Sequence, residues 1–381
     1  MINFQTLKKS KKSKARLGLL ETEHGVIETP AFVPVATQAV VKTLNSEEVE
    51  AAKSQILITN TFHLHLKPGE KIVKSAGGIH HFMNWQRPLM SDSGGFQVFS
   101  FGFGRDLGVG KVLKYFPGEE KIIVKSRAQP KSIKITSDGV YFRSPLDGKK
   151  LFLGPKESMK IQEALGADII YAFDECTPPL SSQKYVAESL ERTHKWAKIC
   201  LKTKSSNQAI YGIIQGSRFK KLRQKSSKFI SSLGFDGFGI GGDLGKNKEE
   251  MREILRWVIP NLSQNKPRHL LGIGHLEDME NIIKEGIDTF DCIIPTHYAR
   301  RGIAFTSLGK LDLRKSIFLK DKTSLDKKCF CFVCEKYKKN YIAHLLRAGE
   351  ITGMKLLTFH NLHFFNTFAE KLREKIKNGK I

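Results

Sequence analysis

Short apolar runs recur along the chain, and most of them end in a small or polar residue. Eight of them occupy residues 31–36, 56–59, 88–91, 169–173, 210–214, 238–240, 269–273 and 287–290. Helix-like stretches, with apolar residues three to four positions apart, lie between many of these runs. Eight strands that alternate with helices predict an α/β fold, the (β/α)8 TIM barrel, although a doubly wound open sheet would give a similar alternation.

The predicted helices carry recognisable start signals. They occupy residues 46–53, 155–165, 183–201, 220–233 and 248–258. We expect Ser46, which is followed by glutamate, to cap the first helix, and Pro155 to begin the second. Residues 102–144 interrupt the alternation with lysine-rich, β-branched segments, which predict an inserted β-hairpin or small meander. Its lysines either contact RNA or form a solvated face.

The position of polar residues favours the barrel over the open sheet. Side chains and glycines suited to a binding site follow the apolar runs at Asp92, Asp174, Gln215, 241–242, 272–274 and Asp291. In a TIM barrel the carboxyl ends of all strands converge on one face, where active sites are built. We therefore expect these residues to surround one site.

The chain is strongly basic. It has 381 residues with 63 Lys and Arg against 38 Asp and Glu, a formal net charge of +25. Lysine and arginine cluster in residues 8–14, 220–228, 314–339 and 371–380. Such an excess attracts a polyanion such as a nucleic acid, because neutralised phosphates release counterions. The alternatives are a solubility adaptation and, less well supported, an anionic membrane surface.

Neither a membrane span nor secretion is expected from the sequence. It contains no run of eighteen apolar residues, and the amino-terminal segment has no apolar core of a signal peptide. The mean hydropathy is −0.29. We expect a cytoplasmic protein in which clustered cysteines bind metal rather than form disulfides.

A metal site is predicted by the pattern C-x-C-x2-C at Cys329, Cys331 and Cys334. Three thiolates and one histidine form the usual closed, structural zinc site. His344, His360 and His363 are the candidate fourth ligands, and the spacing alone does not choose among them. The competing interpretation is three free thiols at a helix cap. We expect a catalytic domain over residues 1–312 and a zinc-binding subdomain with a carboxy-terminal helix over 313–381.

Three strand-end acids are candidates for chemistry. Asp92 begins the glycine-rich turn after the third run, and Asp291 follows the last run. Two carboxylates, one nucleophile and one acid/base, are the simplest set for double displacement at a sugar carbon. Asp174 can accept two adjacent N–H groups of a guanine edge, while Gln215 or the glycine backbone can reach its O6. Each acid has a plainer alternative: capping a loop, capping a helix, or holding a barrel loop.

Taken together, the motifs resemble the queuine tRNA-ribosyltransferase family, also called tRNA-guanine transglycosylases, of bacterial type. The segments that carry the resemblance are SDSGGFQVFS, FDECTP, IIQGS, GFDGFGIGG, GIDTFDCIIPT and CFCFVC followed by HN. The resemblance implies a TIM barrel with a zinc subdomain, usually a homodimer. It also implies exchange of guanine at the wobble position of tRNAs with GUN anticodons for a 7-deazaguanine.

The resemblance assigns roles to residues of this chain. It implies that Asp291 is the nucleophile that forms a covalent ribosyl-enzyme and that Asp92 is the general acid/base. Arg300 matches an anticodon-binding arginine, and His360 matches the fourth zinc ligand. The positions that match base-binding residues are Phe96, Gln97, Asp174, Gln215, Gly242 and Leu271.

The chain departs from the family pattern at three places. GGDLGKN stands where bacterial members usually have GGLAVGE, so that, aligned without a gap, Asn247 replaces a glutamate. His297 and His275 stand where an arginine and a lysine are usual. The resemblance favours 7-aminomethyl-7-deazaguanine as the incoming base, with queuine as an alternative. A non-catalytic tRNA-binding paralogue is the rival function, and the presence of both Asp92 and Asp291 argues against it.

Overall fold

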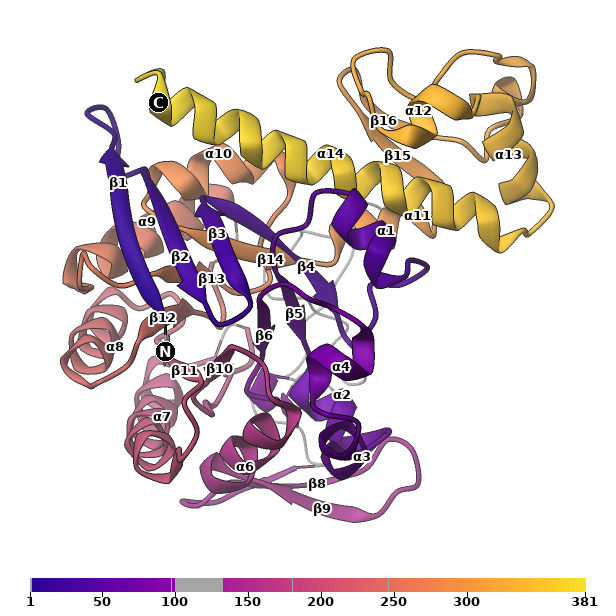
Figure 1. The fold of residues 1–381 in the computed structure, drawn as a ribbon. Helices are drawn as coiled ribbons and strands as arrows, with labels where there is room; N and C mark the ends of the chain where they lie inside the picture. Colours follow the sequence, from indigo (N-terminus) through magenta and orange to yellow (C-terminus); the bar gives the residue numbers. More distant parts are fainter. Residues whose placement is uncertain (1, 97, 100–132, 180, 246) are drawn as a thin grey trace.

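The protein is described by a computed structural model that covers residues 2–381 except 97, 180, 246 and 100–132. Its centre is a closed barrel of eight parallel strands (Figure 1). The strands are β4 (Ala31–Ala36), β5 (Leu57–Thr59), β6 (Leu89–Ser91), β10 (Ile169–Tyr171), β11 (Ala209–Ile214), β12 (Gly237–Ile240), β13 (Arg268–Leu270) and β14 (Thr289–Cys292). They follow each other around the barrel in chain order, and β14 pairs with β4. The barrel prediction is confirmed, and each predicted run overlaps one strand.

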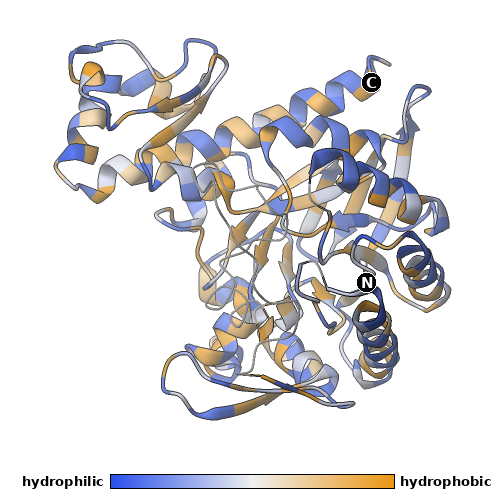
Figure 2. Ribbon diagram, turned by 180° about the vertical axis from the view of Figure 1, so that it is seen from behind, coloured by the Kyte–Doolittle hydropathy of each residue, from blue (hydrophilic) through white to orange (hydrophobic). Residues whose placement is uncertain are grey.

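Helices surround the barrel (Figure 1). They are α1 (Ser46–Ala51), α2 (Thr61–Leu66), α3 (Glu70–Ser75), α4 (Ile79–Met83), α6 (Pro155–Leu165), α7 (Gln183–Thr203), α8 (Lys220–Ser232), α9 (Lys248–Val258), η1 (Ile259–Asn261), α10 (Leu276–Lys284) and α11 (Ile294–Ala299). Figure 2 shows largely apolar central strands, whereas the helices carry both colours. No helix of the described residues is long and apolar enough to cross a membrane.

The predicted cap of the first helix was wrong by one residue. Asn45, not Ser46, has the extended backbone of a cap, and its side chain accepts the N–H of Glu48. The Glu48 carboxylate accepts the N–H of Asn45 in return, which completes a capping box. Ser46 is already helical, and its hydroxyl donates to the carbonyl of Met83 instead.

An amino-terminal sheet closes the end of the barrel at which the strands begin. We call this the lower end of the barrel, and the end at which the strands finish the upper end, whatever the orientation in Figure 1. The sheet consists of β1 (Asn3–Lys9), β2 (Arg16–Thr22) and β3 (Gly25–Thr29), all antiparallel. Leu20 and Ile27 are fully buried and pack in one cluster with interior barrel side chains. This sheet was not predicted from the sequence, in which residues 8–14 stand out only as a basic cluster.

Three aspartates join neighbouring strands at this lower end. Asp168, Asp236 and Asp288 each lie at or just before the start of a strand. Their carboxylates accept the backbone N–H of Leu89, Ile210 and Arg268 on the preceding strand of the barrel, each at 2.8 Å. The lower end is thereby fixed by carboxylates as well as by the strand ladder.

Two of these carboxylates also have cationic or histidine partners. Asp288 is fully buried and forms a two-point ion pair with Arg16 of β2, at 2.6 and 2.7 Å. Asp168 contacts the imidazoles of His24, at 2.7 Å, and His80, at 3.2 Å. The two imidazole rings stack with centroids 3.6 Å apart. These contacts tie the amino-terminal sheet to the barrel.

The described part of the predicted insertion is β-structure. Strands β7 (Lys134–Ile135) and β8 (Val140–Arg143) pair antiparallel, and β9 (Lys150–Leu153) extends the sheet beyond residue 144. Residues 102–132 of the predicted insertion lie outside the described residues.

The carboxy-terminal part projects beyond the barrel (Figure 1). It contains the hairpin β15 (Ile303–Thr306) and β16 (Gly309–Asp312), η2 (Ser316–Lys320), α12 (Phe332–Lys336), α13 (Lys339–Arg347) and α14 (Ile351–Lys377). Helix α14 lies along the barrel as far as the amino-terminal sheet, where Lys8 donates to the carbonyl of Lys377 and Arg373 to that of Pro30. The division at residue 312 stays a prediction.

Candidate active site and metal site

A cavity of about 350 Å³ opens at the upper end of the barrel, where the strands end. It brings together residues from the ends of all eight barrel strands, which are far apart in sequence. Among the predicted site residues, those that line it are Asp92, Phe96, Asp174, Gln215, Gly242, Leu271 and Asp291. Gln97 lies outside the described residues. The polar residues that follow the apolar runs in the sequence therefore meet in one cavity, because the ends of the barrel strands converge.

Asp92 is held at the cavity by its neighbours on the end of β5. Its carboxylate accepts a hydrogen bond from the Asn60 side chain at 2.6 Å and from the N–H of Thr61 at 2.9 Å. The N–H of Gly94 donates to the same carboxylate at 3.1 Å. Asp92 thus caps its loop, as the alternative interpretation expected, and it also lines the cavity. Asn60 and Thr61 were missed in the sequence, although they follow an apolar run in the same way as Asp92.

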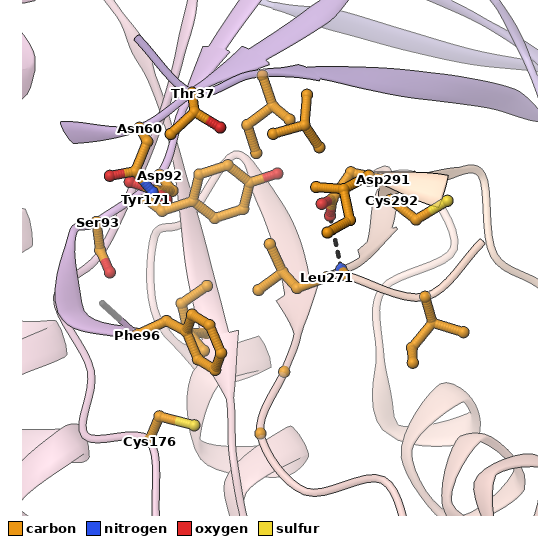
Figure 3. A pocket seen from close by; sticks show the side chains of 18 of the residues that line it. Thr37, Asn60, Asp92, Ser93, Phe96, Tyr171, Cys176, Leu271, Asp291 and Cys292 are labelled. Carbon is orange, nitrogen blue, oxygen red and sulfur yellow. Dashed lines mark hydrogen bonds between the residues drawn. The ribbon is translucent and has the colours of Figure 1, made fainter. Parts of the chain in front are cut away.

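Asp291 faces Asp92 across the cavity. Figure 3 shows Asp92 and Asn60 on one side and Asp291 on the other, with the ring of Tyr171 between them. The Asp291 carboxylate accepts the N–H of Gly272 at 2.7 Å and contacts the imidazole of His269 at 3.1 Å. It therefore holds the β13 loop, as the structural alternative required, and faces the cavity as well. Burial is the main cause that raises the pKa of Tyr171 well above its usual value, so the ring lies there as a neutral group.

Asp174 and Gln215 form a buried polar pair. Gln215 donates its side-chain N–H to Asp174 at 2.6 Å, and the hydroxyl of Ser93 donates at 3.2 Å. The helix-cap alternative for Asp174 is wrong, because helix α7 is capped by Ser182 instead. A carboxylate and an amide at one wall can offer an acceptor pair and a donor to a flat polar ligand.

Gly242 permits this pair to form. It has φ +79°, and a Cβ added there would lie 2.0 Å from the side-chain oxygen of Gln215. Gly95 is similar, since a Cβ there would lie 2.7 Å from the carbonyl oxygen of Asp174. Glycines at these positions therefore allow the polar pair and the backbone to approach one another.

Arg223 joins the two loops that carry Gln215 and Gly242. Its guanidinium is fully buried and donates to the carbonyls of Ile214 and Ser217 after β11, and of Gly241 and Asp243 after β12, at 2.7 to 3.1 Å. Burial lowers its pKa to about 10, so it stays charged at neutral pH. This role of Arg223, which belongs to the basic cluster of residues 220–228, was not predicted, because nothing in the helix pattern marks which cation faces inward.

Positively charged side chains act on two histidines, of which His63 lines the cavity. The pKa of His63 is lowered by burial and by the charge of Lys42. Burial also lowers the pKa of His297, with further contributions from Arg301, Arg300 and Lys42. These residues therefore lie close to one another. Arg300 itself is not among the described residues that line the cavity, and its side chain donates to the carbonyl of Thr296.

The cysteine cluster forms a site that could hold a metal ion. The ligand atoms of Cys329, Cys331, Cys334 and His360 all lie within 4.8 Å of one another. The three sulfurs are 3.8, 3.5 and 3.3 Å from His360 Nδ1. A tetrahedral zinc site, with bonds of about 2.3 Å to sulfur and 2.0–2.1 Å to nitrogen, separates these atoms by about 3.5 Å. The donor set and its spacing therefore fit zinc.

His360 is oriented for this role by a backbone contact. Its Nε2 lies 2.8 Å from the carbonyl oxygen of Phe305 on β15, which fixes the proton on Nε2 and turns Nδ1 to the sulfurs. Among the described contacts, His363 approaches one of the three cysteines, with its Nδ1 3.9 Å from the sulfur of Cys329. The structure therefore groups His360, rather than His344 or His363, with the three cysteines, and helix α14 carries it.

Comparison with known proteins agrees with the motifs. A model of the queuine tRNA-ribosyltransferase family matches residues 10–381. The chain belongs to this family. It is 44% identical to the queuine tRNA-ribosyltransferases of Halothermothrix orenii and of Moorella thermoacetica, in each case over 100% of this chain and 95% of the relative. A putative queuine tRNA-ribosyltransferase of Archaeoglobus fulgidus is 42% identical over 96% of this chain and 94% of its own length. Membership in the family makes the chain an enzyme of the pentosyltransferase class.

Proposed function

We propose that this protein is a tRNA-guanine transglycosylase that exchanges the wobble guanine of GUN-anticodon tRNAs for a 7-deazaguanine through a covalent intermediate on Asp291. The observation that carries the proposal is the placement of two carboxylates, Asp92 and Asp291, on different strand ends of one cavity. A nucleophile and an acid/base are the groups that double displacement at C1′ needs.

In the first half-reaction the Asp291 carboxylate attacks C1′ of the ribose, and the bond from C1′ to the guanine nitrogen breaks. A proton from Asp92 neutralises the departing base. The product is a ribosyl ester of Asp291, which conserves the energy of the glycosidic bond. The guanine must first leave its stack, which costs a few kcal/mol, roughly, for a flipped base.

In the second half-reaction a 7-deazaguanine occupies the position that guanine has left. Asp92 removes the proton from its N9, N9 attacks C1′, and the Asp291 carboxylate leaves. Two inversions give net retention at C1′. Asp92 thus donates a proton in one step and accepts one in the next, and the enzyme ends unchanged.

Base recognition falls to the polar wall of the cavity. The Asp174 carboxylate accepts N1–H and the exocyclic amine of the purine, while Gln215 and the N–H of Gly242 turn to its O6. The side-chain N–H of Gln215 donates to Asp174 at 2.6 Å, which keeps the two side chains together at this wall. Phe96, Gln97 and Leu271 complete the base site, with Phe96 and Leu271 against the two faces of the ring. We expect 7-aminomethyl-7-deazaguanine as the incoming base, with queuine as the alternative.

The anticodon arm is held by positive charge. The charge of Lys42 acts on His63 in the cavity and, together with Arg300 and Arg301, on His297, and the chain as a whole carries a net charge of +25. Contacts to phosphates position an RNA without reading its sequence. Arg300 is the residue that we assign to the anticodon. A cytoplasmic location suits this partner and the cysteines, none of which forms a disulfide in the structure.

Zinc and a second copy of the chain complete the proposed assembly. Cys329, Cys331, Cys334 and His360 would hold one structural Zn²⁺, which supplies cross-linking and no chemistry. The part of the chain around this site exposes large apolar side chains, such as Leu308 (93% exposed), Phe330 (79%) and Ile317 (72%). Exposed apolar side chains of this kind are typical of protein interfaces. They support a homodimer.

A guanine-exchange assay tests the proposed function. Labelled guanine is offered to a tRNA with a GUN anticodon, and we expect incorporation by the wild type and a loss of at least about 10³-fold in Asp291→Ala. Thermal melting of both proteins serves as the control for folding. Competition with each deazaguanine then identifies the incoming base. Equal incorporation by the two proteins would remove Asp291 from the mechanism.

A further inference from the structure

A fully buried histidine lies against the proposed nucleophile. His269 is on β13, and its Nε2 lies 3.1 Å from Oδ1 of Asp291 on β14. In the register of the two strands His269 is opposite Thr289, and Asp291 is two residues further along β14, so that its side chain is on the same face. The histidine is not among the residues that line the cavity. His269 therefore contacts Asp291 without itself lining the cavity.

The hydrogen bonds of His269 fix its tautomer. An ionised carboxylate can only accept, so the proton lies on Nε2 and points to Asp291. The other nitrogen, Nδ1, is 2.9 Å from the hydroxyl of Thr289 and accepts a hydrogen bond from it. The N–H of Gly272 donates to the same Oδ1 at 2.7 Å. Oδ1 of the Asp291 carboxylate thus accepts hydrogen bonds from one backbone N–H and one imidazole N–H.

We propose that His269 is a positioning residue that sets the balance between free Asp291 and its ribosyl ester. This inference rests on the proposed function. A hydrogen bond to a charged acceptor is stronger than one to a neutral acceptor. The Nε2–H of His269 therefore stabilises the carboxylate more than the ester. It holds back the attack slightly and favours the second half-reaction, in which the carboxylate is the leaving group.

Removal of this donor shifts the balance in a direction that simple damage would not. In His269→Leu we expect the ratio of covalent ester to free enzyme to rise about tenfold, the change that corresponds to loss of one charge-assisted hydrogen bond. Turnover falls because breakdown of the ester becomes slow. A merely structural defect would lower ester formation and turnover together. His269→Gln retains an N–H donor and is expected to restore a ratio near that of the wild type.

The experiment measures the ester directly. Each protein is incubated with excess anticodon stem–loop and a fixed concentration of guanine, quenched in denaturant, and separated on a denaturing gel. His24→Leu is the matched control, because it removes a histidine–aspartate contact of 2.7 Å at the opposite end of the barrel. We expect His24→Leu to lower the melting temperature and leave the ester ratio unchanged.

The outcomes separate the two proposals. No exchange and no ester in the wild type would overturn the proposed function itself. A wild type that forms the ester, with an unchanged or lower ratio in folded His269→Leu, would overturn the inference alone. If His269→Leu does not fold, Thr289→Val decides, since it removes the hydroxyl that orients the ring and leaves the imidazole. A ratio raised in the same direction supports the inference, and an unchanged ratio overturns it.

Discussion

Aspartates occupy both ends of the barrel strands, and strand β14 has one at each end. Asp288, just before the strand, is fully buried and paired with Arg16. Asp291, within the other end, is bound by the N–H of Gly272 and by His269 and lines the cavity. Both carboxylates accept a backbone N–H from β13 or its loop. What differs is the second environment: a guanidinium and the amino-terminal sheet below, a ligand-sized cavity above. The same residue type therefore stabilises at one end and is available for chemistry at the other.

The largest effect is expected where stability depends on metal. Helix α14 runs from His360 to the lower end of the barrel, where Lys8 and Arg373 fasten it. We expect His360→Ala to lose zinc and to melt at least about 20 °C lower, since structural zinc contributes on the order of 10 kcal/mol to folding. His363→Ala should retain one equivalent. Metal content by atomic absorption and thermal melting provide the measurements, and equal zinc loss in both variants would contradict the assignment of His360.

An intermediate effect is expected from the lower carboxylate of β14. Asp288→Asn leaves Arg16 buried without its counter-charge, which costs about 3–5 kcal/mol for a broken buried pair. Chemical denaturation measures the loss. Guanine exchange per folded molecule should stay near the wild-type value.

Asp92→Asn is the matched variant at the upper end, for which we expect the reverse. Loss of an acid/base lowers exchange by about 10²–10⁴-fold, and the melting temperature should change little. The comparison between the two ends fails if Asp288→Asn abolishes exchange in protein that remains folded.

The smallest effect concerns acid pH. Burial alone would raise the pKa of Asp168, but hydrogen bonds from His80, His24 and the N–H of Leu89 outweigh it and lower the pKa. Its stabilisation is therefore complete above the unfolded pKa of about 3.9 and is lost as the pH falls below that value. We expect Asp168→Asn to be less stable at neutral pH and to show a shallower loss of stability between about pH 5 and 2. A wild-type slope in this variant would exclude Asp168 from acid unfolding.

The barrel could be predicted because its strands are buried on both faces and appear as continuous apolar runs. The amino-terminal sheet was not predicted, because its strands are not buried on both faces. Leu20 and Ile27 are buried, but β2 and β3 contain few apolar residues, and some of these, such as Val26, are exposed, so that neither strand forms a continuous apolar run. The hydrophobic pattern of residues 16–29 is therefore too irregular to predict these two strands.

In the candidate site, too, some residues could be predicted from the sequence and others could not. Asp92, Asp174 and Asp291 were recognisable because acids after apolar runs stand out, and the family motifs assigned their roles. His269 lies inside an apolar run, where a histidine reads as part of the core, and only the strand register places it beside Asp291. Arg223 is one cation among several on α8, and its inward position depends on packing.

Arg223 also has a consequence for altering which base the enzyme accepts. One guanidinium binds carbonyls of both the Gln215 loop and the Gly242 loop, so the two loops form a single unit. A substitution that reshapes one loop is transmitted to the other. Redesign of selectivity by successive single changes would pass through inactive intermediates, whereas libraries that vary both loops together, with Arg223 kept, can reach new pockets in one step.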